Sequence, residues 1–137
     1  MIAVMYRKNR WNRKDMGGNK YRASKIETTV GKFDSKLEFK RYLYLKSLQD
    51  EGRISDLTRQ VPYTLIPSQK DHTGKVLFRE VRYVSDFEYN LPSGEHVVED
   101  TKGIVLPVFK IKQKLMYYFF GIEVKVIKNR GKEWVIV

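Results

Sequence analysis

The sequence contains no cysteine among its 137 residues and only two histidines, His72 and His96. Without cysteine the chain forms neither disulfide bonds nor thiolate metal sites, and the two histidines are not at a metal-ligand spacing. A zinc site is therefore excluded in practice. The lack of disulfides is also typical of an intracellular protein, which we expect here.

Long apolar segments are absent as well. No stretch approaches the ~18–20 apolar residues that a membrane-spanning helix needs. The N-terminal run MIAVMYRKNR becomes charged after a few residues, which does not predict a signal peptide. The sequence has no G-x-x-x-x-G-K-[ST] loop. We therefore expect a cytoplasmic protein that binds neither a membrane nor a nucleotide cofactor.

Acidic residues are few compared with basic ones. The chain has 27 lysines and arginines against 16 aspartates and glutamates, a net charge of +11, and its pI is about 9.8. A domain pI above ~9 is typical of nucleic-acid-binding proteins. Residues 1–25 contain eight basic residues and one acid, a local charge of +7, which leaves +4 for the other 112 residues.

The basic residues of this segment are interleaved with Trp11, Tyr21 and glycines, and they show little apolar periodicity. We interpret residues 1–25 as a flexible arm that contacts DNA phosphates, called the N-terminal arm below. A solvated tail that only aids solubility is the alternative. The candidate phosphate contacts are Arg7, Lys8, Arg10, Arg13, Lys14, Lys20 and Arg22.

A first helix is predicted within residues 33–54, FDSKLEFKRYLYLKSLQDEGRI. Asp34 or Ser35 is a suitable N-cap, and Gly52 is a suitable C-terminal stop. Apolar residues at helical spacing predict a stripe that faces the core. The stripe consists of Leu37, Tyr44, Leu45 and Leu48.

A second helix is predicted at residues 108–121, with Pro107 near its first turn and Gly121 at its end. We expect the four aromatic residues at 117–120 to lie in the core. The lysines of this helix are candidate phosphate contacts. They are Lys110, Lys112 and Lys114.

Extended segments are predicted between and beyond the helices, bounded by turn residues. They lie at residues 24–33, 60–67, 76–90, 95–103, 122–128 and 133–137. The order of helix, three strands, helix and two strands predicts an α/β (α+β) fold, with a mixed central β-sheet flanked by helices. We expect residues 26–137 to form this domain, with a long 76–102 hairpin at its centre.

The run VVEDTKG places charges in a strand that is otherwise apolar. Because side chains alternate along a strand, Asp100 and Lys102 share one face and Glu99 points to the other. Folding the hairpin about Ser93 brings Asp86 opposite Asp100, with Cβ atoms ~4.5–5.5 Å apart. A slip of one residue would pair Asp86 with Glu99 instead.

The same alternation sorts the preceding strand into two faces. The apolar face is predicted to contain Val81, Tyr83, Phe87 and Tyr89, and the opposite face Arg82, Asp86 and Glu88.

Two opposed carboxylates repel each other unless a cation lies between them, and Mg²⁺ or Mn²⁺ prefers such oxygen ligands. Lys102, on the same face as Asp100, could orient a water molecule or stabilise charge on a phosphate. Together these groups suit phosphodiester hydrolysis. The alternative is a solvated salt-bridge cluster in which Lys102 only neutralises the two aspartates.

Asp86, followed fourteen residues later by Asp100-Thr101-Lys102, resembles the motif of the PD-(D/E)XK nuclease superfamily. The resemblance covers residues 33–128. More narrowly, the runs FDSKLEFKRYLYL, QVPYTLIP, YVSDFEY and VVEDTKG resemble a small phage-encoded branch regarded as Holliday junction resolvases or related recombination endonucleases. The proline of the superfamily name is absent, because Ser85 precedes Asp86.

The resemblance implies a restriction-endonuclease-like core of order αβββαβ and a metal-dependent endonuclease. It makes Asp86 and Asp100 ligands of Mg²⁺ or Mn²⁺ and Lys102 the water-orienting group. It adds Glu38 as a further acid at the metal and places Gln60 near the site. For Glu38 a capping box with the preceding serine is the alternative, in which it would only close the start of the helix.

We therefore expect an endodeoxyribonuclease that acts on branched DNA in phage recombination or replication, in the host cytoplasm if phage-encoded. A homodimer is expected, because cutting two opposed strands needs two sites. Two alternatives remain at this point. One is a nuclease for linear or single-stranded DNA, and the other is a non-catalytic basic DNA-binding protein.

Overall fold

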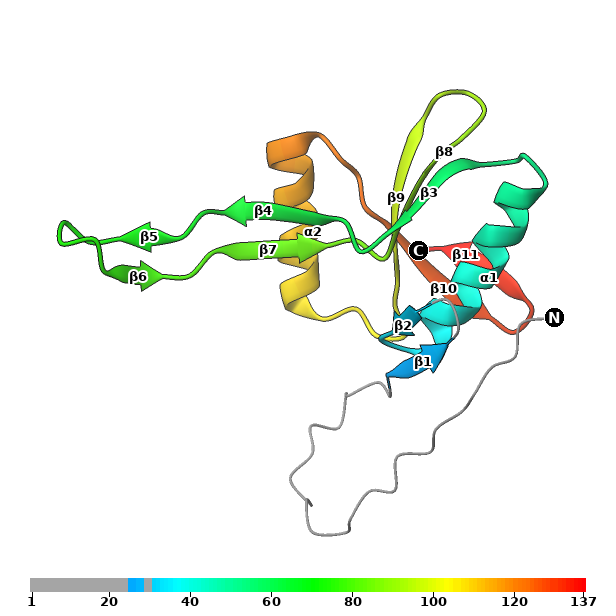
Figure 1. The fold of residues 1–137 in the computed structure, drawn as a ribbon, viewed down its shortest axis with the longest axis horizontal. Coiled ribbons are helices and arrows are strands. Elements are labelled where there is room, and N and C mark those ends of the chain that lie inside the picture. The colour runs from blue at the N-terminus through cyan, green and yellow to red at the C-terminus, as the bar shows by residue number, and fades with distance from the viewer. Residues whose placement is uncertain (1–24, 29–30) are drawn as a thin grey trace, which may run out of the picture.

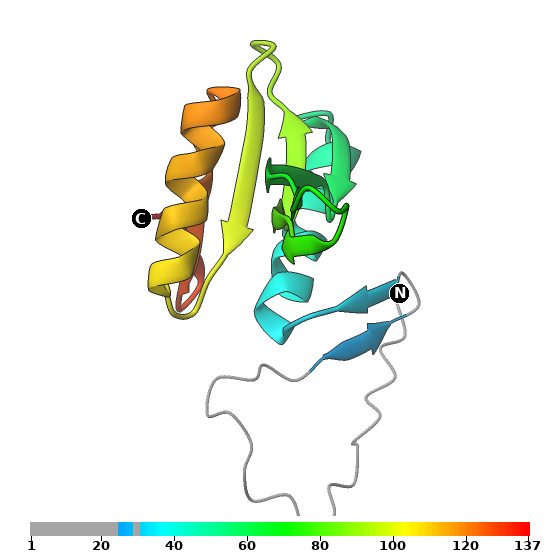
Figure 2. The same ribbon diagram turned by 90° about the vertical axis from the view of Figure 1, so that its left-hand side faces the viewer.

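The computed structural model describes residues 25–28 and 31–137, so the predicted N-terminal arm lies outside the described residues except for Lys25. The α+β class is confirmed: two helices enclose a five-stranded mixed sheet (Figures 1 and 2). The helices are α1 (Lys36–Asp50) and α2 (Pro107–Phe120). The sheet order is β11 (Glu133–Ile136), β10 (Lys125–Arg130), β9 (His96–Thr101), β8 (Phe87–Asn90) and β3 (Ser55–Arg59).

Three pairs of shorter strands lie outside this sheet. They are β1 (Ile26–Thr28) with β2 (Gly31–Phe33), β4 (Pro62–Ile66) with β7 (Val81–Val84), and β5 (Gln69–Lys70) with β6 (Val76–Phe78). Within the described residues, no helix is long and apolar enough to cross a membrane.

Helix α1 starts at its N-cap Ser35, whose Oγ accepts a hydrogen bond from the backbone N–H of Glu38 at 3.0 Å. Leu45 of the predicted stripe is fully buried, but Tyr44 is 42% exposed. The helix buries Phe39 and Arg41 instead. The predicted stripe is thus partly wrong, because a buried arginine gives no apolar signal in the sequence.

Helix α2 has the predicted ends, with Pro107 in its first turn and Gly121 at its C-cap in the left-handed region, at φ 67°. Its buried residues are Phe109 and Met116. The expectation that residues 117–120 lie in the core is wrong: these side chains are 45–80% exposed. Four consecutive residues span more than one turn, and α2 packs against the sheet on one side only.

The central sheet follows the order α1, β3, β8, β9, α2, β10, with β3, β8 and β9 antiparallel and β10 parallel to β9. The register of the β8–β9 hairpin is the predicted one, because Phe87 pairs with Glu99 and Asn90 with His96. This is the register obtained by folding about Ser93.

Two strand predictions are wrong. Residues 76–90 are not one strand, because the chain bends at Ser85 and Asp86 and leaves one sheet for another. The bend resets the alternation, so Tyr83 packs in the cluster beneath α2 whereas Phe87 packs in the cluster beneath α1. The third central strand is β3, which was not predicted, and residues 60–67 belong to a separate hairpin.

The core consists of two clusters, one on each face of the sheet. The α2 side contains Leu65, Tyr83, Val98, Phe109, Met116, Val124 and Val126. The α1 side contains Leu45, Ile54, Phe87 and Tyr89.

Residues 62–84, strands β4 to β7, form a long two-stranded hairpin that extends away from the body of the molecule (Figure 1). We call it the projecting hairpin. Its base packs on α2 through ring contacts of Tyr63 with Phe120, at 5.4 Å between centroids, and of Tyr83 with Phe109, at 6.3 Å. The base is therefore fixed to the core, directly beside the bend that carries Asp86.

Candidate active site

The candidate residues meet where β8 begins and β9 ends, at the base of the projecting hairpin. Asp86 directly precedes β8, Asp100 lies in β9, and Lys102 directly follows it. The side chain of Glu99 points to the opposite face, where it pairs with Arg41. Period-two alternation therefore separates the two neighbouring acids as the sequence predicted.

Asp100 is only 2% exposed and is held by two side chains. Tyr83 donates its hydroxyl hydrogen to Oδ2 at 2.9 Å, and Lys102 Nζ lies 2.7 Å from Oδ1. The lysine contact is an ion pair by distance, but its direction falls outside hydrogen-bond geometry. Oδ1 is therefore a buried oxygen that accepts no hydrogen bond from the described residues.

Asp86 is fixed by the strand opposite. Its Oδ2 accepts hydrogen bonds from the backbone N–H and the hydroxyl of Thr101, both at 2.9 Å. The pKa of Asp86 is nevertheless raised to about 8, first by burial and then by the negative charges of Asp100 and Glu38. Folding thus brings the charges of Asp100 and Glu38 close enough to oppose the ionisation of Asp86.

Glu38 is 2% exposed, and each of its two oxygens has its own partners. Oε2 accepts the backbone N–H of Asp34 at 3.0 Å, which closes the helix start. Oε1 accepts the side-chain amide of Gln60 at 3.1 Å, and Arg59 Nη2 lies 3.5 Å from it. Burial is the main cause that raises the pKa of Glu38. The side chain therefore combines a capping contact with a position close enough to influence Asp86.

Gln60 connects these acids. Its backbone is in the left-handed region, at φ 54°, which a non-glycine residue rarely adopts. Its backbone N–H donates to the carbonyl of Asp86 at 3.3 Å while its side chain holds Glu38. Strained backbone of this kind clusters at functional sites, where the surroundings over-determine it.

A cavity of about 330 Å³ opens between β7 and the N-terminal half of α2. Asp100 and Lys102 line it together with two further basic residues, Arg82 and Lys112. The cavity therefore combines one candidate acid, Asp100, with positive charge, which suits a phosphate group.

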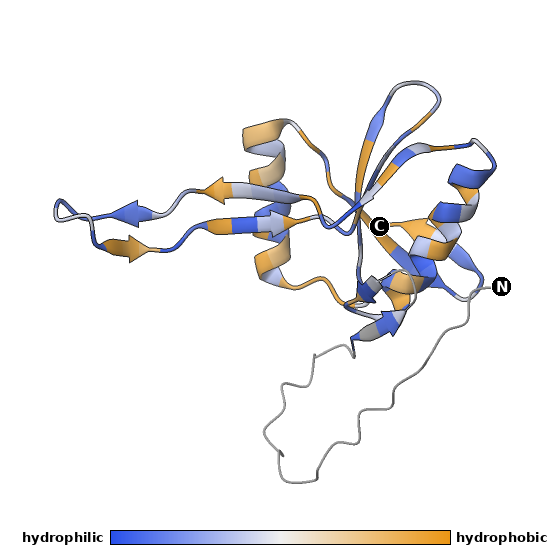
Figure 3. Ribbon diagram, in the orientation of Figure 1, coloured by the Kyte–Doolittle hydropathy of each residue, from blue (hydrophilic) through white to orange (hydrophobic). Residues whose placement is uncertain are grey.

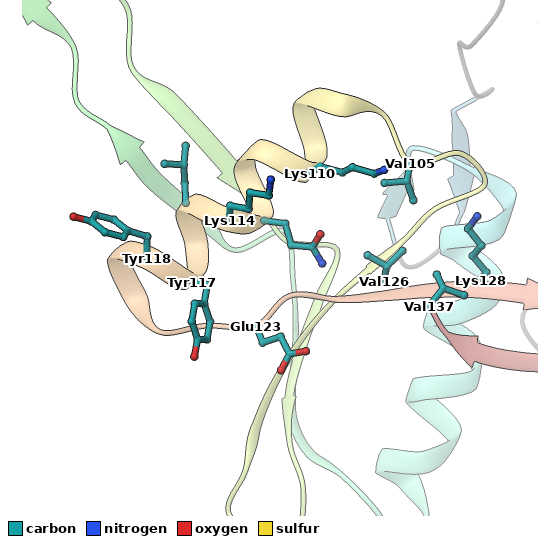
Figure 4. A pocket seen from close by; sticks show the side chains of 11 residues that line it. Val105, Lys110, Lys114, Tyr117, Tyr118, Glu123, Val126, Lys128 and Val137 are labelled. Carbon is teal, nitrogen blue, oxygen red and sulfur yellow. The ribbon is translucent and has the colours of Figure 1, made fainter.

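The other two candidate lysines of α2 lie elsewhere. Lys110 and Lys114 line a larger cavity of about 950 Å³ between α2 and β10, with Val126 and Tyr117 (Figure 4). None of Glu38, Asp86, Asp100 or Lys102 lines this larger cavity. Of the three lysines predicted on α2, only Lys112 lines the same cavity as Asp100 and Lys102.

Three supporting residues were not found by sequence reasoning. The sequence predicts Tyr83 on an apolar face and Arg82 on a polar one, and it gives Thr101 no role of its own. It does contain one signal for Thr101, because a hydroxyl residue between two charged ones in a strand can hold the neighbouring strand's acid. No local pattern predicts that Tyr83 reaches Asp100, because the bend at residues 85–86 decides it.

Within residues 25–28 and 31–137, no three carboxylate or imidazole groups form a ready metal-ligand set. Two carboxylates are a suitable number for Mg²⁺, which keeps several waters and binds substrate phosphates. Two observations fit a cation here: buried Asp100 Oδ1 accepts no hydrogen bond from the described residues and has a positive neighbour in the Lys102 ammonium, 2.7 Å away, and the pKa of Asp86 is raised to about 8 by burial and negative neighbours. Asp86 and Asp100 are thus the residues that would hold it.

A known family pattern matches residues 18–132 of the sequence. The chain belongs to the DUF1064 family. This family is described as "protein of unknown function", and the matched region includes all four candidate site residues of the DUF1064 chain. No curated protein and no solved structure matches the chain.

Proposed function

We propose that this DUF1064 protein is a metal-dependent endodeoxyribonuclease that hydrolyses phosphodiester bonds. The observation that supports this most is the convergence of Asp86, Asp100 and Lys102 at one end of the β8–β9 hairpin. The pKa of Asp86 is raised to about 8 there by burial and by neighbouring carboxylates. An arrangement that costs stability when it is ionised needs a functional reason, and cation binding supplies one.

Asp86 and Asp100 would hold the cation, and Glu38 would lie at its edge. Bound Mg²⁺ or Mn²⁺ supplies Lewis-acid polarisation of the phosphate and a lower pKa for a coordinated water. Tyr83 fixes the orientation of Asp100 through a 2.9 Å hydrogen bond, and Thr101 fixes Asp86 through two. These hydrogen bonds fix the orientation of both carboxylates before a cation binds.

Lys102 acts on the reacting groups. Its ammonium is held 2.7 Å from Asp100 and lines the same cavity as Arg82 and Lys112. From there it orients the attacking water and stabilises the charge that develops on the phosphate. The water oxygen bonds to phosphorus as the water gives up one proton to solvent, one phosphorus–oxygen ester bond breaks, and the departing alkoxide takes up one proton from solvent, so that the protons balance.

Branched DNA is the proposed substrate, because the resemblance is to Holliday junction resolvases. A net charge of +11 supports a polyanionic partner. A homodimer in the cytoplasm would provide the two sites that paired cuts require. Cleavage of linear or single-stranded DNA uses the same chemistry and is distinguished by a substrate panel.

The first experiment is cleavage of a labelled four-way junction beside linear duplex and single-stranded controls, with Mg²⁺, with Mn²⁺ and with chelator. We expect metal-dependent cutting of the junction, and a loss of at least ~100-fold in rate for Lys102→Ala with DNA binding retained. Lys132→Ala, which removes an exposed lysine of the β10–β11 turn, is the matched control. If wild type and both variants bind DNA tightly but cleave none of the substrates, the protein is instead a non-catalytic DNA-binding protein.

A further inference from the structure

The outer part of the projecting hairpin buries nothing within the described part of the chain. All of residues 67–80 except Asp71 are exposed, and β5 pairs only with β6. A two-stranded ribbon on its own is marginally stable in water. We therefore expect a binding partner to bury the side chains of this ribbon and to stabilise it.

The turn at the end of the hairpin is well defined. Asp71 Oδ1 accepts the backbone N–H groups of Thr73, at 2.8 Å, and Lys75, at 3.1 Å. Its side chain also accepts the Thr73 hydroxyl, and these bonds lower the pKa of Asp71. Gly74 provides the left-handed residue at φ 89°. The end of the ribbon is thus pre-organised, which reduces the entropy cost of binding.

The ribbon carries three consecutive exposed apolar residues, visible as the hydrophobic strand β6 near the end of the hairpin (Figure 3). Val76, Leu77 and Phe78 are 46%, 57% and 63% exposed. The pairing with β5 is irregular here: Gln69 pairs with Phe78 and Lys70 pairs with Val76, so the register shifts at Leu77. The three apolar side chains are thus exposed where the strand ladder is interrupted, which suits an element that is inserted into its partner.

The basic residues of the ribbon that are unpaired in the described chain favour a polyanionic partner. Lys70, Lys75 and Arg79 form no ion pair within the described residues, while Glu80 is paired with Arg82. Lysine is depleted in protein–protein interfaces, whereas DNA interfaces are strongly positive. Apolar wedges inserted between base steps occur in DNA-bending proteins, next to basic residues that hold the phosphates.

We propose that this ribbon is a DNA wedge, in which Leu77 and Phe78 insert between bases of the bound DNA and Lys70, Lys75 and Arg79 hold the flanking phosphates. The inference rests on the proposed function to the extent that DNA is the ligand. The seven residues from Val84 to Leu77 span ~23 Å, so the wedge acts within one helical turn of the candidate site. Unstacking costs least where pairing is already disturbed, which favours a branch point.

The test measures base unstacking in DNA labelled with 2-aminopurine at single positions. The positions cover the branch point and about one turn of each arm of a four-way junction, with the matched duplex as a second ligand. The full chain with Lys102→Ala is used, so that cleavage does not remove the ligand. We expect a several-fold fluorescence increase at one or two adjacent positions.

Leu77→Ala/Phe78→Ala should abolish this increase and weaken binding about ten-fold, since one base–aromatic stack, that of Phe78, contributes on the order of 1–3 kcal/mol. Ile136→Ala, which removes an apolar side chain that is 67% exposed on β11, should change neither. Lys70→Ala/Lys75→Ala/Arg79→Ala should keep the fluorescence increase at low salt. It should reduce the slope of log K against log[salt] by ~0.9 for each phosphate that the variant no longer neutralises.

An increase that is absent at every position, or that persists in the Leu77/Phe78 variant, overturns the wedge. So does conversion of a dimer to a monomer by that variant without a fluorescence change, which would make a second copy the partner. If the wild-type protein unstacks bases but cuts no DNA, the proposed nuclease function is wrong and the wedge is supported. If it cuts DNA without unstacking bases, the wedge is wrong and the nuclease function is supported.

Discussion

The carboxyl group of Asp86 is harder to ionise in the folded protein than in the unfolded chain. Its pKa rises from 3.8 to about 8, because it is buried beside Asp100 and Glu38. Between these pH values the folded state holds a proton that the unfolded chain has released. The stability of the metal-free protein therefore decreases as the pH rises from about 4 to about 8.

Asp86→Asn removes this ionisation. In chelator we expect the stability of the variant relative to wild type to increase by on the order of 3–4 kcal/mol between pH 5 and pH 8, because one pKa unit corresponds to ~1.4 kcal/mol. Thermal unfolding from pH 5 to 9 measures it. Asp50→Asn, which changes an exposed carboxylate of α1, is the control and should keep the wild-type profile.

Added Mg²⁺ should stabilise wild type at pH 8, where about half of the Asp86 carboxyl groups are ionised, and should not stabilise Asp86→Asn. A wild-type profile in chelator that is flat between pH 5 and 8 would show that Asp100 and Glu38 do not oppose the ionisation of Asp86. The charges of VVEDTKG would then be a structural cluster, the alternative left open by the sequence.

The direction in which a site residue points was predictable where it depends only on the alternation of side chains along a strand. Glu99 was separated from Asp100 because neighbours on a strand face opposite sides, and the structure places Glu99 against Arg41. The partners of Asp100 were not predictable in this way. Tyr83 reaches it because the chain bends at residues 85 and 86, and a bend between two strand-like runs leaves no periodic signal.

At the scale of elements, the pair formed by Arg41 and Glu99 connects α1 to the central sheet. Two hydrogen bonds join them, at 2.6 and 2.8 Å, and the Tyr89 hydroxyl donates to the same carboxylate at 2.8 Å. The guanidinium also lies 5.1 Å from the ring centroid of Trp134 on β11. Glu99 is therefore a fixed structural acid, in contrast to the acid that follows it.

Arg41→Ala leaves Glu99 as an uncompensated buried charge. We expect a loss of ~3–5 kcal/mol in the free energy of unfolding, measured by urea denaturation. Lys46→Ala on the same helix is the matched control, because its pair with Asp50 is exposed and should contribute no more than ~0.5 kcal/mol. Equal losses in the two variants would contradict a special role for the buried pair.

The elements themselves were predictable to different degrees. The register of β8 with β9 followed from the turn around Ser93, where Gly94 has a φ of 89°. Strand β3 was missed because SDLTR is polar and lies at the sheet edge, where period-two alternation is weak. Residues 60–67 have strand composition, but their composition does not say which sheet they join.

At the scale of the whole molecule, the body and the projecting hairpin divide the proposed work. The body positions the acids between two helix-covered faces, and the projecting hairpin starts where the site is. Sequence order predicted a helix, three strands, a helix and two strands, but it took residues 60–67 for the first of the three strands, which is β3 in the structure. It did not predict that the projecting hairpin extends from the body, because the sequence of a hairpin inserted between β3 and β8 has the same local pattern as two further strands of the central sheet.

The distribution of charge gives the last prediction, which concerns the N-terminal arm outside the described residues. Deleting residues 1–22 removes seven of the 27 basic residues and one acid. If these residues release counterions from DNA, the slope of log K against log[salt] should become shallower by ~0.9 for each phosphate that is no longer neutralised. Titrations from low to physiological salt measure the slope, and substitution of four arm residues by glutamine (Arg7, Lys8, Arg10 and Arg13) tests charge without shortening the chain.

Metal-dependent cleavage by the shortened protein should persist at low salt, because Asp86, Asp100 and Lys102 are all retained. An unchanged slope in both variants would assign DNA binding to the body alone and leave the +7 of the arm to solubility.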